Sequence, residues 1–161
     1  MNAPQKIQFE CTITSPDLAV KELSEALLSK LEVIAGKRLP DGVHRIDGTD
    51  ILYALTESTT HHDAAKAVAK LEKVPGHSPW ELATPHEAVL LVDYSRYNPA
   101  IDTDKHPGIG SEWCWLKDVY KSSPSDFAWL VNFSGGYVYY GDRGSRDRAL
   151  AVCRPAPASQ Q

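Results

Sequence analysis

Residues 80–87 are Trp-Glu-Leu-Ala-Thr-Pro-His-Glu, and this stretch decides the fold because it marks a strand or loop that runs directly into a helix. Thr84 is a favourable N-cap residue, and Pro85 takes the first helical position, where its missing N–H costs nothing. Glu87 follows three residues after the cap and completes a capping box. Apolar residues at positions 88, 89, 91 and 92 supply one helical face, so the pattern predicts a helix over residues 85–94.

The segment with the clearest periodicity lies upstream of this stretch. Residues 7–13 alternate between apolar and polar side chains, which predicts a half-buried strand. Ser15-Pro16-Asp17 then opens a helix with a cap, a first-turn proline and a first-turn acid. Apolar residues recur at spacings of three and four, so we expect one helical face to be buried; they are Val20, Leu23, Leu27, Leu31 and Ile34. Residues 7–35 are also where a homo-oligomer would form, because an exposed strand edge pairs readily with a copy of itself.

The remaining elements alternate between helices and strands and then become mostly strands. A short apolar run predicts a strand at residues 51–55, and a helix follows at about 61–73 with Ala64, Ala65, Val68 and Leu71 facing inward. Residues 94–111 hold prolines, glycines and few aliphatic residues, which predicts a long irregular loop. Strands are expected at 113–116, 128–133, 137–140 and 149–153, with a hairpin turn at Ser134-Gly135-Gly136. This order predicts the α+β class, with helices packed on a small, mostly antiparallel sheet.

Composition narrows the class of protein. The chain has 161 residues, 42% of them apolar, which fits one globular domain. A formal net charge of −4 argues against nucleic-acid binding, because duplex recognition needs a basic surface. No apolar run is long enough for a membrane span, and the N-terminus lacks the apolar core of a signal peptide. We therefore expect a cytoplasmic or virion-associated protein, with Cys11, Cys114 and Cys153 as buried free thiols.

Six short motifs follow one another between residues 80 and 154 of the chain. They are Trp80, Leu82, Thr84 and Glu87, then Leu91-Val92-Asp93, Pro99-Ala100-Ile101, the strand from Ala128 to Phe133, Gly135-Gly136 and Val152-Cys153-Arg154. Taken in this order, they resemble the Lcl C-terminal domain family, a bacterial and phage branch of the C-type-lectin-like fold. The chain departs from the family pattern at Glu81, Ala83 and Trp113-Cys114-Trp115, and it lacks the cysteine usual on the first family helix. The disulfide expected with the terminal cysteine therefore cannot form in that way.

The resemblance implies a division of the chain and a place for the ligand. Residues 50–155 would form the C-type-lectin-like domain, residues 1–49 a strand–helix extension packed on it, and residues 156–161 a frayed tail. In such folds the ligand is usually bound by loops, which here correspond to residues 103–127 and 134–148. The expected binding surface is Trp115, Asp118, Tyr120, Tyr137, Tyr139, Arg143, Arg146 and Asp147.

Each of these assignments has a structural alternative. Trp115 and Tyr139 are as consistent with core packing as with ligand contact, whereas Trp129 and Phe133 are expected in the core. The polar segment 141–148 is either a solvated turn or a contact surface, with the turn favoured. Trp113 and Trp115 are two apart on a predicted strand, so they share one face, and Cys114 faces the other way.

Metal and catalytic chemistry are less favoured by the sequence. The Glu-Pro-Asn or Gln-Pro-Asp loop of calcium-dependent lectins is missing, as is any cluster of the six to eight oxygens that calcium needs. His61 and His62 point about 100° apart on a helix, so we expect polar first-turn residues rather than a metal site. Cys114 with Cys153 offers the alternative of a cysteine-dependent enzyme related to formylglycine-generating enzymes.

Taken together, these patterns favour a non-enzymatic binding module of phage or prophage type. It would recognise a protein or a surface glycan without calcium or another cofactor.

Overall fold

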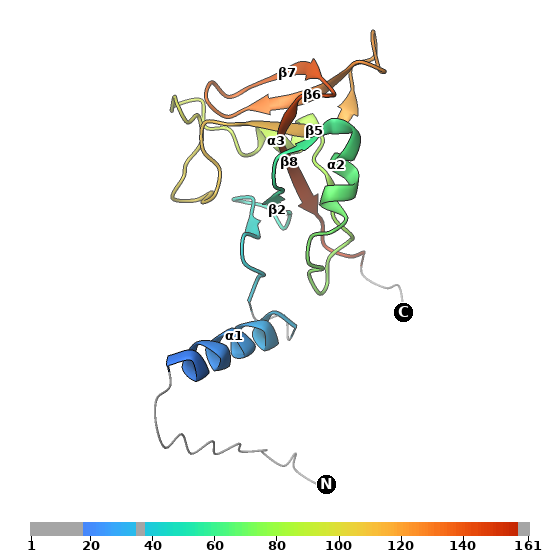
Figure 1. Ribbon diagram of the computed structural model, residues 1–161. Helices are drawn as coiled ribbons and strands as arrows, with labels where there is room; N and C mark the ends of the chain where they lie inside the picture. The colour runs from blue at the N-terminus through green and yellow to red at the C-terminus, as the bar shows by residue number, and fades with distance from the viewer. Residues whose placement is uncertain (1–17, 35–37, 158–161) are drawn as a thin grey trace.

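The computed structural model describes residues 18–34 and 38–157 and confirms a mixed α+β protein with a mostly antiparallel sheet (Figure 1). The predicted strand at residues 7–13 and Cys11 lie outside the described residues. In chain order the elements are α1 (Leu18–Ile34), β1 (His44–Arg45), β2 (Leu52–Leu55), β3 (Thr59–Thr60), α2 (His61–Val68), β4 (Glu81–Leu82), α3 (Pro85–Val89), β5 (Trp113–Val119), β6 (Phe127–Asn132), β7 (Tyr137–Asp142) and β8 (Arg146–Cys153). No described helix is long and apolar enough to cross a membrane.

Strand β8 organises the sheet. The strand order is β1-β2-β8-β5-β6-β7, and the short strands β3 and β4 also pair with β8. Among these pairs β5 and β8 run parallel, with Trp115 opposite Ala149, and the others run antiparallel. Strand β8, the last that the structure describes, is therefore inserted between β2 and β5, which lie far apart in the sequence.

Both faces of the sheet carry a hydrophobic core, as the period-two alternation of β8 requires. Ala149, Ala151 and Cys153 belong to the core on the face that also holds Ala64 and Val68 of α2. Leu150 and Val152 belong to the core on the opposite face, which is covered by α3 and the long loop. Phe133 is fully buried on this second face, as predicted, whereas Trp129 is only partly buried there.

The capping box is present, but both helices of the domain are shorter than predicted. The Thr84 hydroxyl accepts from the Glu87 N–H, and the Glu87 carboxylate accepts from the Thr84 N–H at 2.9 Å. Helix α3 stops at Val89 and α2 at Val68, because the turns that follow have backbone hydrogen bonds three residues apart, as in a 3₁₀ helix. Ala65, predicted to face inward, is exposed.

The expected burial of the apolar face of α1 is wrong for the leucines that the structure describes. Leu23 is 72% exposed and Leu27 60% exposed, and Leu28 and Leu31 are similarly open. None of these four leucines belongs to either hydrophobic core. Periodicity indicates that a helix has an apolar face, but it does not indicate what covers that face.

Candidate functional site

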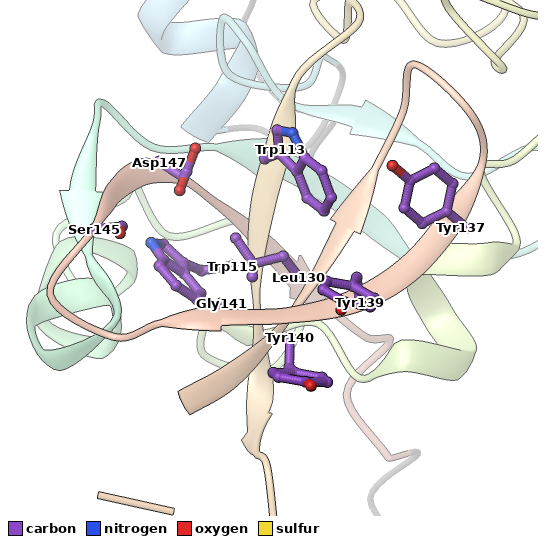
Figure 2. A pocket seen from close by; sticks show the side chains of 9 residues that line it. All are labelled: Trp113, Trp115, Leu130, Tyr137, Tyr139, Tyr140, Gly141, Ser145 and Asp147. Carbon is purple, nitrogen blue, oxygen red and sulfur yellow. The ribbon is translucent and has the colours of Figure 1, made fainter. Parts of the chain in front are cut away.

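An open, mostly aromatic pocket of about 490 Å³ lies on one face of strands β5 to β8 (Figure 2). Figure 2 shows Trp113, Tyr137 and Tyr139 along one side of the pocket, with Asp147 and Ser145 on the other. The lining residues are Trp113, Trp115, Leu130, Tyr137, Tyr139, Tyr140, Gly141, Ser145 and Asp147.

Strand register builds the pocket from two rows of side chains. Trp113 lies opposite Asn132 on β6, and Asn132 lies opposite Tyr137 on β7. In the next row Trp115 lies opposite Leu130, which lies opposite Tyr139. Residues two apart share a face, so the rings of both rows stand on the same side of the sheet. The rings of Trp113 and Tyr137 meet edge to face, with centroids 5.7 Å apart.

Neither α2 nor α3 covers the pocket. Helix α2 packs against β3, β4 and β8, whereas α3 contacts β5, β6 and β7 from the opposite face. Tyr137 and Tyr139 therefore remain 49% and 51% exposed. Gly141 leaves space in the pocket, because a Cβ at this position would lie 2.9 Å from the Cδ1 atom of Leu130.

Asp147 gives the pocket a carboxylate among the aromatic rings. It is half-buried, and among the described residues its side chain forms no ion pair or hydrogen bond. Its neighbours Arg146 and Arg148 alternate to the other face of β8, where their guanidinium groups donate to the carbonyls of Ser58 and Thr56. Burial raises the pKa of Asp147, and no nearby cation offsets the effect.

Trp115 forms the floor of the pocket and is held from behind. Its side chain is fully buried, its Nε1–H donates to the Thr59 carbonyl at 3.2 Å, and its ring meets the imidazole of His61 edge to face. The His61 Nε2–H donates to the Leu116 carbonyl at 3.1 Å, so its Nδ1 accepts from Arg143 Nε at 3.1 Å. Burial is the main cause that lowers the pKa of His61.

Both histidines lie in the first turn of α2, where the sequence predicts polar first-turn residues, but their surroundings differ. His61 is only 7% exposed, whereas His62 is exposed. The first turn of α2 faces the sheet at His61 because the helix begins immediately after β3, which pairs with β8.

The structure brings half of the predicted binding surface into the pocket. Trp115, Tyr137, Tyr139 and Asp147 line it, together with Trp113, which was predicted only to share a face with Trp115. Leu130, Tyr140, Gly141 and Ser145 were not among the predicted site residues, because their place depends on strand pairing that the sequence does not reveal.

The other predicted residues lie elsewhere. Asp118 and Tyr120 border a separate hollow beside Trp129, and the Tyr120 ring stacks on Tyr140 at 4.3 Å. Arg143 is engaged by His61 and by the Pro124 carbonyl, and Arg146 by the Ser58 carbonyl. These two arginines therefore have structural partners. The polar segment 141–148 consists of the end of β7, a turn and the start of β8.

The two described cysteines do not form a joint site. Both are buried and free, but Cys114 lies in the core under α3 and Cys153 in the core under α2. Burial raises the pKa of Cys153 to about 11 and that of Cys114 further, so both are protonated thiols at neutral pH. Within residues 18–34 and 38–157, no group of three or more His, Cys, Asp or Glu side chains is arranged to hold a metal ion.

Comparison with known proteins places the pocket within a family domain. No curated protein matches the chain. Residues 42–153 match the family model of the Lcl C-terminal domain, and this range contains strands β1 to β8. The match covers well over half of the chain and contains every residue of the aromatic pocket. The chain therefore belongs to the Lcl C-terminal domain family.

Proposed function

We propose that this domain is a non-enzymatic binding module that recognises its ligand through the aromatic pocket, without calcium. The observation that carries the proposal is that exposed Tyr137 and Tyr139 and partly buried Trp113 line a cavity of about 490 Å³. Aromatic side chains supply much of the binding energy at recognition surfaces, because they bury a large area at little cost in conformational entropy.

We also propose that the domain has a C-type-lectin-like fold.

The ligand class is a protein or a surface glycan, and both are compatible with aromatic rings. The acidic net charge of −4 and the carboxylate of Asp147 favour a protein partner with a basic surface. A module of phage or prophage type has two settings that suit this function. It would bind a host receptor as part of a virion, or bind and block a host factor inside the cell.

The experiment compares two pairs of tyrosines. The full chain and a Tyr137→Ala/Tyr139→Ala variant are immobilised, and partners are captured from a lysate of the native host and on a glycan array. Tyr94→Ala/Tyr97→Ala is the matched control, because these tyrosines are 75% and 82% exposed and lie outside the pocket. All arms are repeated with EDTA.

The proposal predicts a partner that the wild-type chain and the Tyr94/Tyr97 control retain, that the Tyr137/Tyr139 variant loses, and that EDTA does not release. Equal capture by both double variants would refute the assignment of binding to the pocket. Copper-dependent oxidation of a cysteine peptide by the wild-type chain would instead favour the enzyme alternative. The separate positions of Cys114 and Cys153 in the two cores argue against that outcome.

A further inference from the structure

The pocket combines aromatic faces with one carboxylate and lacks basic side chains. Four of its nine lining residues are Trp or Tyr residues of the two cross-strand rows, and none of the nine is Lys, Arg or His. A cation within about 6 Å of an aromatic centroid is attracted by the ring quadrupole, and arginine forms such contacts more often than lysine. The composition therefore favours a positively charged group.

Asp147 supplies the matching negative charge. Strand alternation turns Arg146 and Arg148 to the opposite face, where each guanidinium group has a backbone carbonyl as its partner. No ion pair or side-chain hydrogen bond is found for Asp147 among the residues that the structure describes. A half-buried carboxylate without a partner is costly, and a cationic ligand would offset that cost.

Resting on the function proposed above, we propose that the pocket binds an arginine side chain of a protein partner. The planar guanidinium fork matches both oxygens of Asp147, and the methylene stem lies along Trp113 and Tyr139. Leu130 lies at the apolar bottom of the pocket beneath that stem, packed beside the buried ring of Trp115. A quaternary ammonium group has no N–H to donate to the carboxylate, so it fits this pocket less well.

The test uses three small probes: n-butylguanidinium and n-butylurea, which differ in charge but hardly in shape, and choline, a quaternary ammonium cation. Binding of n-butylguanidinium chloride and of neutral n-butylurea to the full chain is followed by NMR and by tryptophan fluorescence. We expect n-butylguanidinium to bind about tenfold more tightly, and choline to bind more weakly than n-butylguanidinium. Equal affinity for n-butylurea, or tighter binding of choline, would overturn the proposal.

Variants test the role of the carboxylate. Asp147→Asn should weaken n-butylguanidinium binding about tenfold, whereas Asp104→Asn, at an exposed position in the long loop, should leave it unchanged. Near-ultraviolet circular dichroism checks that each variant folds, and the comparison of the three probes on the wild-type chain requires no variant. If partner capture survives Asp147→Asn but is lost in the Tyr137/Tyr139 variant, the binding function stands and the arginine assignment fails.

Discussion

His61 supports the floor of the aromatic pocket only as a neutral imidazole, and this can be tested by replacing it with glutamine. Its Nε2–H donates to the Leu116 carbonyl, which leaves Nδ1 as the acceptor for the Arg143 guanidinium. A proton on Nδ1 would face an N–H of Arg143 and remove that hydrogen bond. Glutamine keeps one donor and one acceptor at this position but cannot titrate.

The expected pH dependence follows from the direction of the pKa shift. In the unfolded chain a histidine titrates near pH 6.5, whereas burial lowers the pKa of folded His61. Below about pH 6.5 the unfolded state therefore binds a proton that the folded state does not yet bind. As the pH is lowered below about 6.5, the free energy of unfolding therefore decreases, by up to about 1.4 kcal/mol per pH unit, until the pH reaches the pKa of folded His61. Above about pH 7.5 His61 is neutral in both states, and the full stability is retained.

The assay is urea unfolding at pH 7.5, 6.5 and 5.5, followed by tryptophan fluorescence, on the wild-type chain, His61→Gln and the neighbouring control His62→Gln. Burial lowers the pKa of His106 as well, so the wild-type slope contains contributions from both histidines. His61→Gln should lose about 1–3 kcal/mol at pH 7.5 from poorer hydrogen bonding and should show the smaller pH slope. The reasoning fails if His61→Gln and wild type lose the same free energy between pH 6.5 and 5.5.

Two further predictions concern the β-hairpin and the first helix. Gly136→Ala should lower the free energy of unfolding by more than about 1 kcal/mol in urea titrations, because φ is +72° and the new Cβ would lie 2.7 Å from Val92 Cγ1. Gly110→Ala, which has open space around it, should not. We also expect copies of the chain to associate through the exposed leucines of α1, so light scattering should give a monomer mass for Leu23→Ser/Leu27→Ser and a larger one for wild type. A monomeric wild-type chain at high concentration would contradict this.

Local signals in the sequence predicted the elements well. The capping box at Thr84 and Glu87, the glycine turn after β6 and the long loop at residues 94–111 all depend on neighbours within a few positions. Alternation also placed Trp113 and Trp115 on one face and Cys114 on the other. Helix ends were predicted less well, because the apolar periodicity continues through the 3₁₀ turns that follow α2 and α3.

The tertiary environment could not be derived in the same way. His61 and His62 are adjacent in a polar segment, and nothing local indicates that one is buried against Trp115 while the other is exposed. The leucines of α1 show the opposite case, because their periodicity is that of a buried helix and they are exposed. Both outcomes depend on where an element lies relative to the sheet.

The same dependence on long-range pairing explains why only half of the predicted binding surface lies in the pocket. Sequence alternation assigns Asp147 to a face of β8, but its nearness to Trp113 and Trp115 requires β8 to pair in parallel with β5. If β8 paired instead with β7, the strand that precedes it in the sequence, it would lie at the far edge of the sheet. Asp147 would then be next to Tyr137 and Tyr139 but not next to the tryptophans. The carboxylate and the tryptophans share a pocket because the last strand is inserted beside β5, so the proposed recognition chemistry is a property of the topology.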